Sequence, residues 1–248
     1  MGALLLIVAL TWAWLIAGAG MDENAVAMTR MYAVDNMVMQ PVAWTVGYAS
    51  VMFAMWWIMM IAMMLPSAAP TILLAAAINR RTQPDRAPYG TSASFALGYL
   101  AAWAAFSFLA VAAQWGLAES DLLSPMFRAT SPAVAGVLLS AAGIWQFTPW
   151  KKACLKHCRS PLQFLLQRHR RGNAGGLVTG IEHGMYCLGC CWSMMGLLFV
   201  GGMMNLYWIV GLTLYVAAEK LLRAGQFIRQ VVGGALILCG LAILGGAS

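Results

Sequence analysis

The chain has 248 residues, of which 62% are hydrophobic and only 9% are charged. Soluble domains carry roughly 25% charged residues, so this composition excludes an ordinary soluble domain and indicates an all-α, polytopic membrane protein. The formal net charge is +7, but the basic residues lie in short loops between apolar runs. That placement indicates that the basic residues orient the protein in a lipid bilayer, and it argues against binding of nucleic acid.

Apolar runs predict about seven transmembrane helices in a single integral membrane domain, 1–248, because a span takes about 20 apolar residues. The runs cover residues 3–19, 45–78, 92–114, 132–150, 177–203, 206–218 and 228–245. The first run has no basic segment before it, which favours an uncleaved span over a signal peptide. The second run contains Pro66 and Pro70, so we expect a kinked or tilted helix there.

Basic residues mark one side of the predicted membrane. The loop 151–175 has seven Lys and Arg residues and no acidic residue, and the loops 79–90 and 219–229 are also basic. Positive loops stay in the cytoplasm. The sequence therefore predicts a cytoplasmic N-terminus and an external C-terminus.

The fifth run contains the stretch GMYCLGCCWSMM, which carries three cysteines. Spacings of i, i+4, i+7, i+8 and i+11 place five side chains on one helical stripe: His183, Cys187, Cys190, Cys191 and Met194. Three glycines at four-residue spacing lie on the same face, and such a pattern lets a second helix approach closely: Gly176, Gly180 and Gly184. This arrangement suits a metal site shared between helices.

A second cysteine group follows the fourth run in the stretch WKKACLKHCRSP. Cys154 and Cys158 share a face if the helix continues until just before Pro161. We expect the two groups to meet at the cytoplasmic end of the bundle, with sulfurs about 4 Å apart around a common metal. Four thiolates suit zinc or an iron–sulfur cluster, and two or three suit Cu(I). Four basic residues nearby should lower the thiol pKa values: Lys151, Lys152, Lys156 and Arg159.

An alternative interpretation treats these cysteines as small buried packing residues. Cys239, alone in the last run, fits that interpretation. His157 and His183 flank the two groups, and each is a metal ligand, a neighbour of the ligands or a solvated residue.

Methionines offer a second set of soft ligands. The second run carries a ladder at helical spacing: Met52, Met55, Met59 and Met63, with Met60 and Met64 beside it. The external loop adds Met21, Met28, Met31, Met37 and Met39. Thioethers favour Cu(I) or Ag(I), whereas the alternative is ordinary core filling. If they handle metal, Met55, Met59 and Met63 should face the interior, toward Met194 or the thiols.

The remaining polar residues give no catalytic constellation. We expect Glu182, Glu219 and Lys220 to lie near the hydrated cytoplasmic interface, and the stretch 162–172 to lie on the anionic inner leaflet. The sequence shows no phosphate-binding loop and no nucleophile–base pair. The chain is therefore not expected to be an enzyme on its own.

Four stretches carry a family resemblance: WWIMMIAMMLPSAAP, WQFTPWKKACLKHCRSP, CLGCCWSMMGLLFVGGMMNLYWI and LTLYVAAEK. With them the chain resembles a bacterial family of predicted metal-binding integral membrane proteins, a domain of unknown function. The resemblance implies a multi-pass helical protein of the bacterial inner membrane with a metal site at the cysteines. It implies no reaction.

Two functions fit these observations. In the first, the protein handles a soft metal, Cu(I) before others, between the outer methionines and the inner cysteines. In the second, it is an accessory or redox subunit of a larger membrane complex with a zinc or iron–sulfur centre. Partner subunits or a homo-oligomer are compatible with both.

Overall fold

The computed structural model describes residues 2–21, 23–33, 43–82, 88–124, 128–168, 170 and 172–246, and every regular element in these ranges is a helix. The helices are α1 (Gly2–Ile16), α2 (Ala25–Ala33), α3 (Val46–Thr82), α4 (Pro88–Glu119), α5 (Pro132–Phe147), α6 (Pro149–Arg159), α7 (Pro161–Arg168), α8 (Gly172–Gly196), α9 (Leu198–Gly201), α10 (Leu206–Leu221) and α11 (Gly225–Gly246). The all-α class predicted from the sequence is confirmed.

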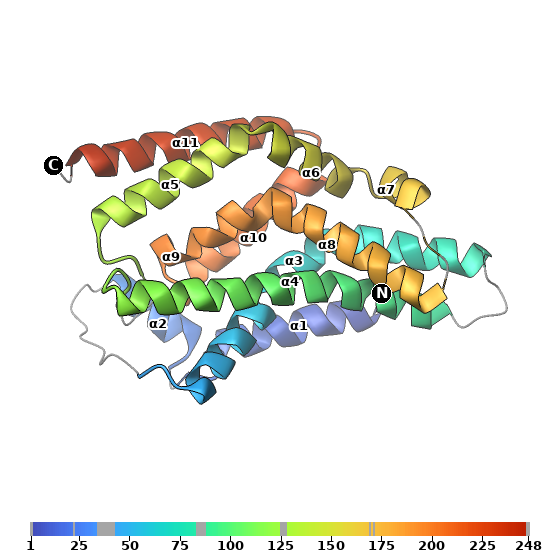
Figure 1. The fold of residues 1–248 in the computed structure, drawn as a ribbon, viewed down its shortest axis with the longest axis horizontal. Coiled ribbons are helices and arrows are strands. Elements are labelled where there is room, and N and C mark those ends of the chain that lie inside the picture. The colour runs from blue at the N-terminus through green and yellow to red at the C-terminus, as the bar shows by residue number, and fades with distance from the viewer. Residues whose placement is uncertain are drawn as a thin grey trace.

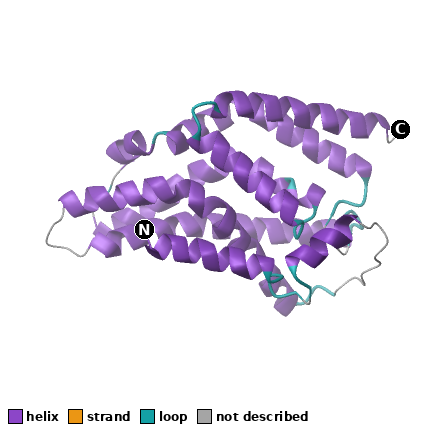
Figure 2. Cartoon of the chain, turned by 180° about the vertical axis from the view of Figure 1, so that it is seen from behind, coloured by secondary structure: helices purple, strands orange, loops and turns teal. Residues whose placement is uncertain are grey.

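The long helices form one elongated bundle (Figure 1). The N-terminus, α7 and the end of α3 lie toward one end of the bundle, whereas the C-terminus, α2 and α9 lie toward the other (Figures 1 and 2). Helices α5 and α11 pack against each other as a pair along one edge. The central helices α3, α4 and α8 enclose most of the core.

Within the described residues, four helices are long and apolar enough to cross a membrane: Val46–Arg81, Gly90–Glu119, Gly172–Gly201 and Gly225–Gly246. Helices α1 and α5 are apolar but shorter. All seven predicted apolar runs are thus helical, while seven spans stay a prediction. Helix α3 continues through Pro66 and Pro70 for 37 residues. At 1.5 Å per residue its length is about 56 Å, which exceeds the thickness of a bilayer core, about 30 Å.

Local signals explain where the chain departs from the expected elements. Thr148 accepts a hydrogen bond from the backbone N–H of Lys151 and Pro149 occupies the first turn, so a new helix, α6, begins there. The expected helical continuation to Cys158 is therefore present as a separate helix with its own direction (Figure 1). Helix α2 lies within the loop expected at 21–40. Met37, Met39, the side chain of Met31 and residues 83–87 lie outside what the structure describes.

The glycine face of α8 packs directly on α4. A Cβ at Gly180 would overlap the carbonyl oxygen of Phe95, and one at Gly184 would lie 2.6 Å from the Cβ of Ala102. Gly176 meets Thr91 in the same way. The close approach predicted from the glycine spacing is confirmed, and α4 is the helix that uses it.

Replacing Gly180 by Val should separate α8 from α4, because the new side chain collides with backbone that cannot rotate away. Overpacking of this kind costs about 1–3 kcal/mol, so the thermal midpoint in detergent should fall. Gly211→Ala, at a helical glycine with no neighbour within 4 Å, is the control and should be neutral or stabilising. Equal midpoints for the two variants would contradict the packing described here.

Candidate metal centre

Four cysteine thiols from two helices meet inside the bundle. The sulfur of Cys158, on α6, lies 3.9 Å from that of Cys190, on α8. Cys190 and Cys191 have their sulfurs 3.2 Å apart, and the Cys190 thiol donates to the backbone carbonyl oxygen of Cys187 at 3.1 Å. We call Cys158, Cys187, Cys190 and Cys191 the thiol cluster. The predicted meeting of the two cysteine groups is confirmed for Cys158.

The thiol cluster is deeply placed. Cys187, Cys190 and Cys191 are at most 1% exposed, and Cys158 is half-buried. Cys187 follows the first residue of α8 by 15 positions, or about 22 Å, so the cluster lies further inside the bundle than the cytoplasmic end expected from the sequence. The break at Thr148 explains this position, because it lets α6 change direction and lie across α8.

One sulfur–sulfur distance in the thiol cluster matches the spacing of two thiolates on a common metal. Tetrahedral thiolates at about 2.3 Å from a metal lie about 3.8 Å from each other, close to the 3.9 Å between Cys158 and Cys190. Across the described ranges, no three or more His, Cys, Asp or Glu side chains are grouped so that they could hold a metal ion as they stand. Interaction with Cys187 raises the pKa of the Cys158 thiol well above its ordinary value.

Three side chains from other helices complete the surroundings of Cys187. The ammonium of Lys220, on α10, donates to the Cys187 sulfur at 3.0 Å and to the Ser67 hydroxyl at 3.3 Å. The Tyr99 hydroxyl, on α4, lies 3.1 Å from the same sulfur. These contacts supply a positive charge and polar partners to a sulfur that is otherwise removed from water. They were not predicted, although a lysine directly after an apolar run was a signal for them.

The basic residues on α6 were expected to lie near the thiols and lower their pKa values, but Lys151 and Arg159 contact α10 and the residues after it instead. Lys151 is fully buried and forms an ion pair of 2.9 Å with Glu219. Arg159 donates to the backbone carbonyls of Leu222 and Arg223. The cation beside the thiols is therefore Lys220, and α6 uses Lys151 and Arg159 to hold the end of α10.

Glu219 and Lys220 do not lie at a hydrated interface, which is where the sequence placed them. Glu219 is fully buried and Lys220 is 6% exposed, because α3, α6 and α8 all pack on α10. Glu182, in contrast, pairs with Arg170 at 2.8 Å in a partly exposed ion pair, in keeping with its expected structural role. Within α7, Phe164 and Leu165 are buried in the bundle, whereas Leu162 and Leu166 are exposed, and the expected contact of this segment with the inner leaflet stays a prediction.

The remaining predicted ligands flank the cluster. Cys154 packs its sulfur against Gly189, and burial raises the pKa of its thiol. His183 packs among the rings of Phe95, Tyr99 and Phe164. Its Nδ1 is buried without a hydrogen-bond partner among the described residues. Ligation by Cys154 and His183 stays a prediction.

His157 is a neighbour of the site. Its ring stacks on that of Tyr186, with centroids 4.1 Å apart, and its Nδ1 lies 2.9 Å from the Ala153 carbonyl oxygen.

The methionine ladder faces the interior as predicted. Met55 and Met59 are fully buried, and Met63 is 1% exposed. The next residue, Met64, approaches the thiol cluster through its backbone, because its carbonyl accepts from the Tyr99 hydroxyl at 3.3 Å. The ladder thus runs along α3 toward the helix segment that adjoins Cys187.

Met194 is held by a separate polar network. The Gln146 side chain donates to the Met194 sulfur at 2.8 Å and accepts from the Tyr215 hydroxyl at 3.1 Å. Arg229, itself buried, donates to the backbone carbonyl of Gln146. The sulfur of Met194 is therefore oriented by α5, α10 and α11 together.

Comparison with protein families matches residues 53–243 to the family described as PpoB2, copper chaperone. The chain belongs to the PpoB2 copper chaperone family. The matched region contains the whole thiol cluster, Lys220 and the ladder from Met55 to Met63. No curated protein and no solved structure matches the chain. Membership of the copper chaperone family supports a copper-handling role, and it fits the metal-binding part of the resemblance found in the sequence.

Breaking the buried ion pair should destabilise this copper chaperone family member strongly. Glu219→Gln leaves the Lys151 ammonium buried without a counter-charge, which costs about 3–5 kcal/mol, whereas replacing both partners by apolar residues is often neutral. The thermal midpoint by circular dichroism should fall for Glu219→Gln and recover in Lys151→Met/Glu219→Leu. A double variant as unstable as the single one would show that the charges themselves are not the cause.

Proposed function

We propose that the chain is an integral membrane copper chaperone that holds Cu(I) in the thiol cluster. The observation that carries this proposal is the meeting of four thiols from α6 and α8 beside the Lys220 ammonium. Thiolates are the soft donors that Cu(I) prefers, and copper is the cargo of the family to which the chain belongs.

The charge of the site favours a monovalent ion. One Cu(I) and the Lys220 ammonium carry two positive charges together, which balance two thiolates in surroundings that exclude water. Buried charge is costly unless it is neutralised. Four thiolates are also the donor set of structural zinc and of iron–sulfur clusters, and the family description favours copper over both.

Methionines extend the proposed route away from the cysteines. Burial of Met59 and Met63 supports their use, because a thioether that faces lipid has no metal to receive. Met194 lies one helical turn beyond Cys190 and Cys191, and the Gln146 amide orients its sulfur. In this proposal Cu(I) passes between the α3 thioethers and the thiol cluster, with Met194 beside it.

The protein is proposed to be a multi-pass protein of the bacterial inner membrane, with its N-terminus inside. The N-terminus, α7 and the basic end of α3 share one end of the bundle, opposite the C-terminus (Figure 1). This sorting agrees with the positive-inside rule. Lipid or a second membrane subunit would cover the exposed apolar face of α11, which is 17% buried within its span.

Removing the three cysteines of α8 should abolish copper binding. Cys187→Ser/Cys190→Ser/Cys191→Ser leaves only Cys158 of the cluster, and one thiol cannot hold Cu(I) against a competing chelator. Copper analysis after loading with Cu(I) and dialysis should give about one copper per chain for the wild type and none for the variant. The control, Cys239→Ser, should bind as the wild type does. Equal copper in the triple variant, or zinc or iron in its place in the wild type, would contradict the proposal.

The methionine route predicts a separate loss. Met55→Leu/Met59→Leu/Met63→Leu keeps volume and hydrophobicity, at a cost below about 1.5 kcal/mol for each position, but removes the thioethers. The variant should fold and keep its cysteine-bound copper, while transfer of Cu(I) or Ag(I) across proteoliposomes is lost. If this variant transfers Cu(I) or Ag(I) as fast as the wild type does, the methionine ladder is not part of the metal route.

A further inference from the structure

We propose that a basic hollow between α6 and the start of α11 binds the phosphate group of an anionic ligand. The hollow measures about 420 Å³, and its lining includes Lys152, Lys156, Arg159, Gln226 and Arg229. None of these residues belongs to the thiol cluster. The inference therefore goes beyond the proposed copper function and gives the protein a second kind of ligand.

Four cations from two helices meet at this hollow. Lys152, Lys156 and Arg159 follow the spacing i, i+4, i+7 and therefore share one side of α6. Arg229 joins them from the second turn of α11. Within the part of the chain that the structure describes, no Asp or Glu lines the hollow and no ion pair neutralises any of the four. A concave surface that carries charges of one sign concentrates ions of the other sign, here anions.

Arg229 makes the strongest demand for an anion. It is only 4% exposed, and one of its N–H groups donates to the backbone carbonyl of Gln146. Its Nε is buried without a hydrogen-bond partner among the described residues, and the buried acid Glu219 is already paired with Lys151. A buried guanidinium is costly unless its charge is neutralised and its donors are used. A ligand oxygen in the hollow meets both requirements.

The donors of the hollow suit a phosphate group. Guanidinium groups bind phosphate oxygens through paired N–H donors, and two of them line the hollow. Arg159 is held in place, since its Nη2 donates to the backbone carbonyls of Leu222 and Arg223, just before α11. Gln226 lies in the first turn of α11, where the helix dipole also favours an anion.

The surroundings of the hollow favour a phospholipid as the source of the phosphate. Helix α11 is long and apolar enough to cross a membrane, and Arg229 lies near its start, on the side proposed to be cytoplasmic. Trp150 and Phe227, which adjoin lining residues, are 74% and 68% exposed, as expected of aromatic side chains at a membrane interface. Basic hollows beside membrane helices on this side bind anionic headgroups. An anionic lipid of the inner leaflet is therefore the expected ligand.

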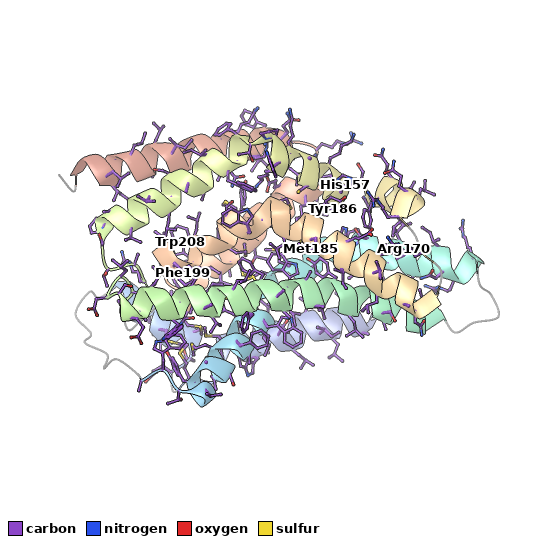
Figure 3. All side chains as sticks on the ribbon, viewed as in Figure 1. His157, Arg170, Met185, Tyr186, Phe199 and Trp208 are labelled. Atoms are coloured by element: carbon purple, nitrogen blue, oxygen red, sulfur yellow. The ribbon has the colours of Figure 1, made fainter. Side chains whose placement is uncertain are left out.

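The hollow is separate from the thiol cluster. On the other side of α6, the Cys158 sulfur faces that of Cys190 on α8, and the ring of His157 stacks on that of Tyr186 (Figure 3). Binding at the hollow can therefore be measured on the metal-free chain, and its failure leaves the proposed copper function untouched.

Two double variants of the full chain, each of which removes two exposed positive charges, test the site. Lys152→Gln/Lys156→Gln changes the hollow, whereas Arg80→Gln/Arg81→Gln changes the exposed end of α3 and is the matched control. In native mass spectrometry from detergent, the hollow variant should bind phosphatidylglycerol about tenfold more weakly than the control variant, because nearby lysines attract anionic headgroups. Phosphatidylcholine, which has no net charge, should show no such difference.

A second arm separates a lipid headgroup from free phosphate. If inorganic phosphate, compared with chloride at equal ionic strength, raises the thermal midpoint of the control variant but not of the hollow variant, while phosphatidylglycerol binds both equally, free phosphate is the ligand. On the unaltered chain, a photoactivatable phosphatidylglycerol should crosslink within residues 149–159 and 225–232, and crosslinks confined to other helices would exclude the lipid. If neither anion distinguishes the two variants, the proposal is overturned.

Discussion

Because Gly180 and Gly184 carry no side chain, the backbone of α8 lies directly against α4. This contact fixes the position of the thiols. It brings the Tyr99 hydroxyl to 3.1 Å from the Cys187 sulfur. The opposite side of α8 is then free to receive α6, whose Cys154 packs on Gly189 and whose Cys158 reaches Cys190. Small residues thus give two helices access to one thiol-bearing helix.

Buried charges hold α10 beside the thiol cluster. Adjacent residues of α10 have separate roles, since Glu219 pairs with Lys151 and Lys220 reaches Cys187. The ion pair ties α6 to α10, so both helices that flank the cluster are linked by groups that are costly to leave unpaired. The Lys220 ammonium gives the sulfurs a counter-charge in the metal-free chain.

The sequence predicted the parts of the site that lie along one helix. Spacing alone gave the buried stripe from His183 to Met194, the glycine face and the interior methionines, because helical periodicity determines which residues share a side. Contacts between distant helices could not be predicted in this way. Tyr99 and Lys220 reach Cys187 from two other helices, Ser67 on a third accepts from Lys220, and nothing in local spacing connects them. The turn at Thr148 and Pro149 had a readable signal, a cap followed by proline, whereas the direction that α6 takes after it depends on packing.

X-ray absorption at the copper edge of the copper-loaded chain tests the central claim most directly, because it reports the atoms bound to the metal. A buried thiol cluster predicts Cu(I) with a shell of sulfur only, and the three α8 serine substitutions should remove that signal. A first shell of nitrogen or oxygen, or an unchanged sulfur shell in the serine variant, would contradict the account.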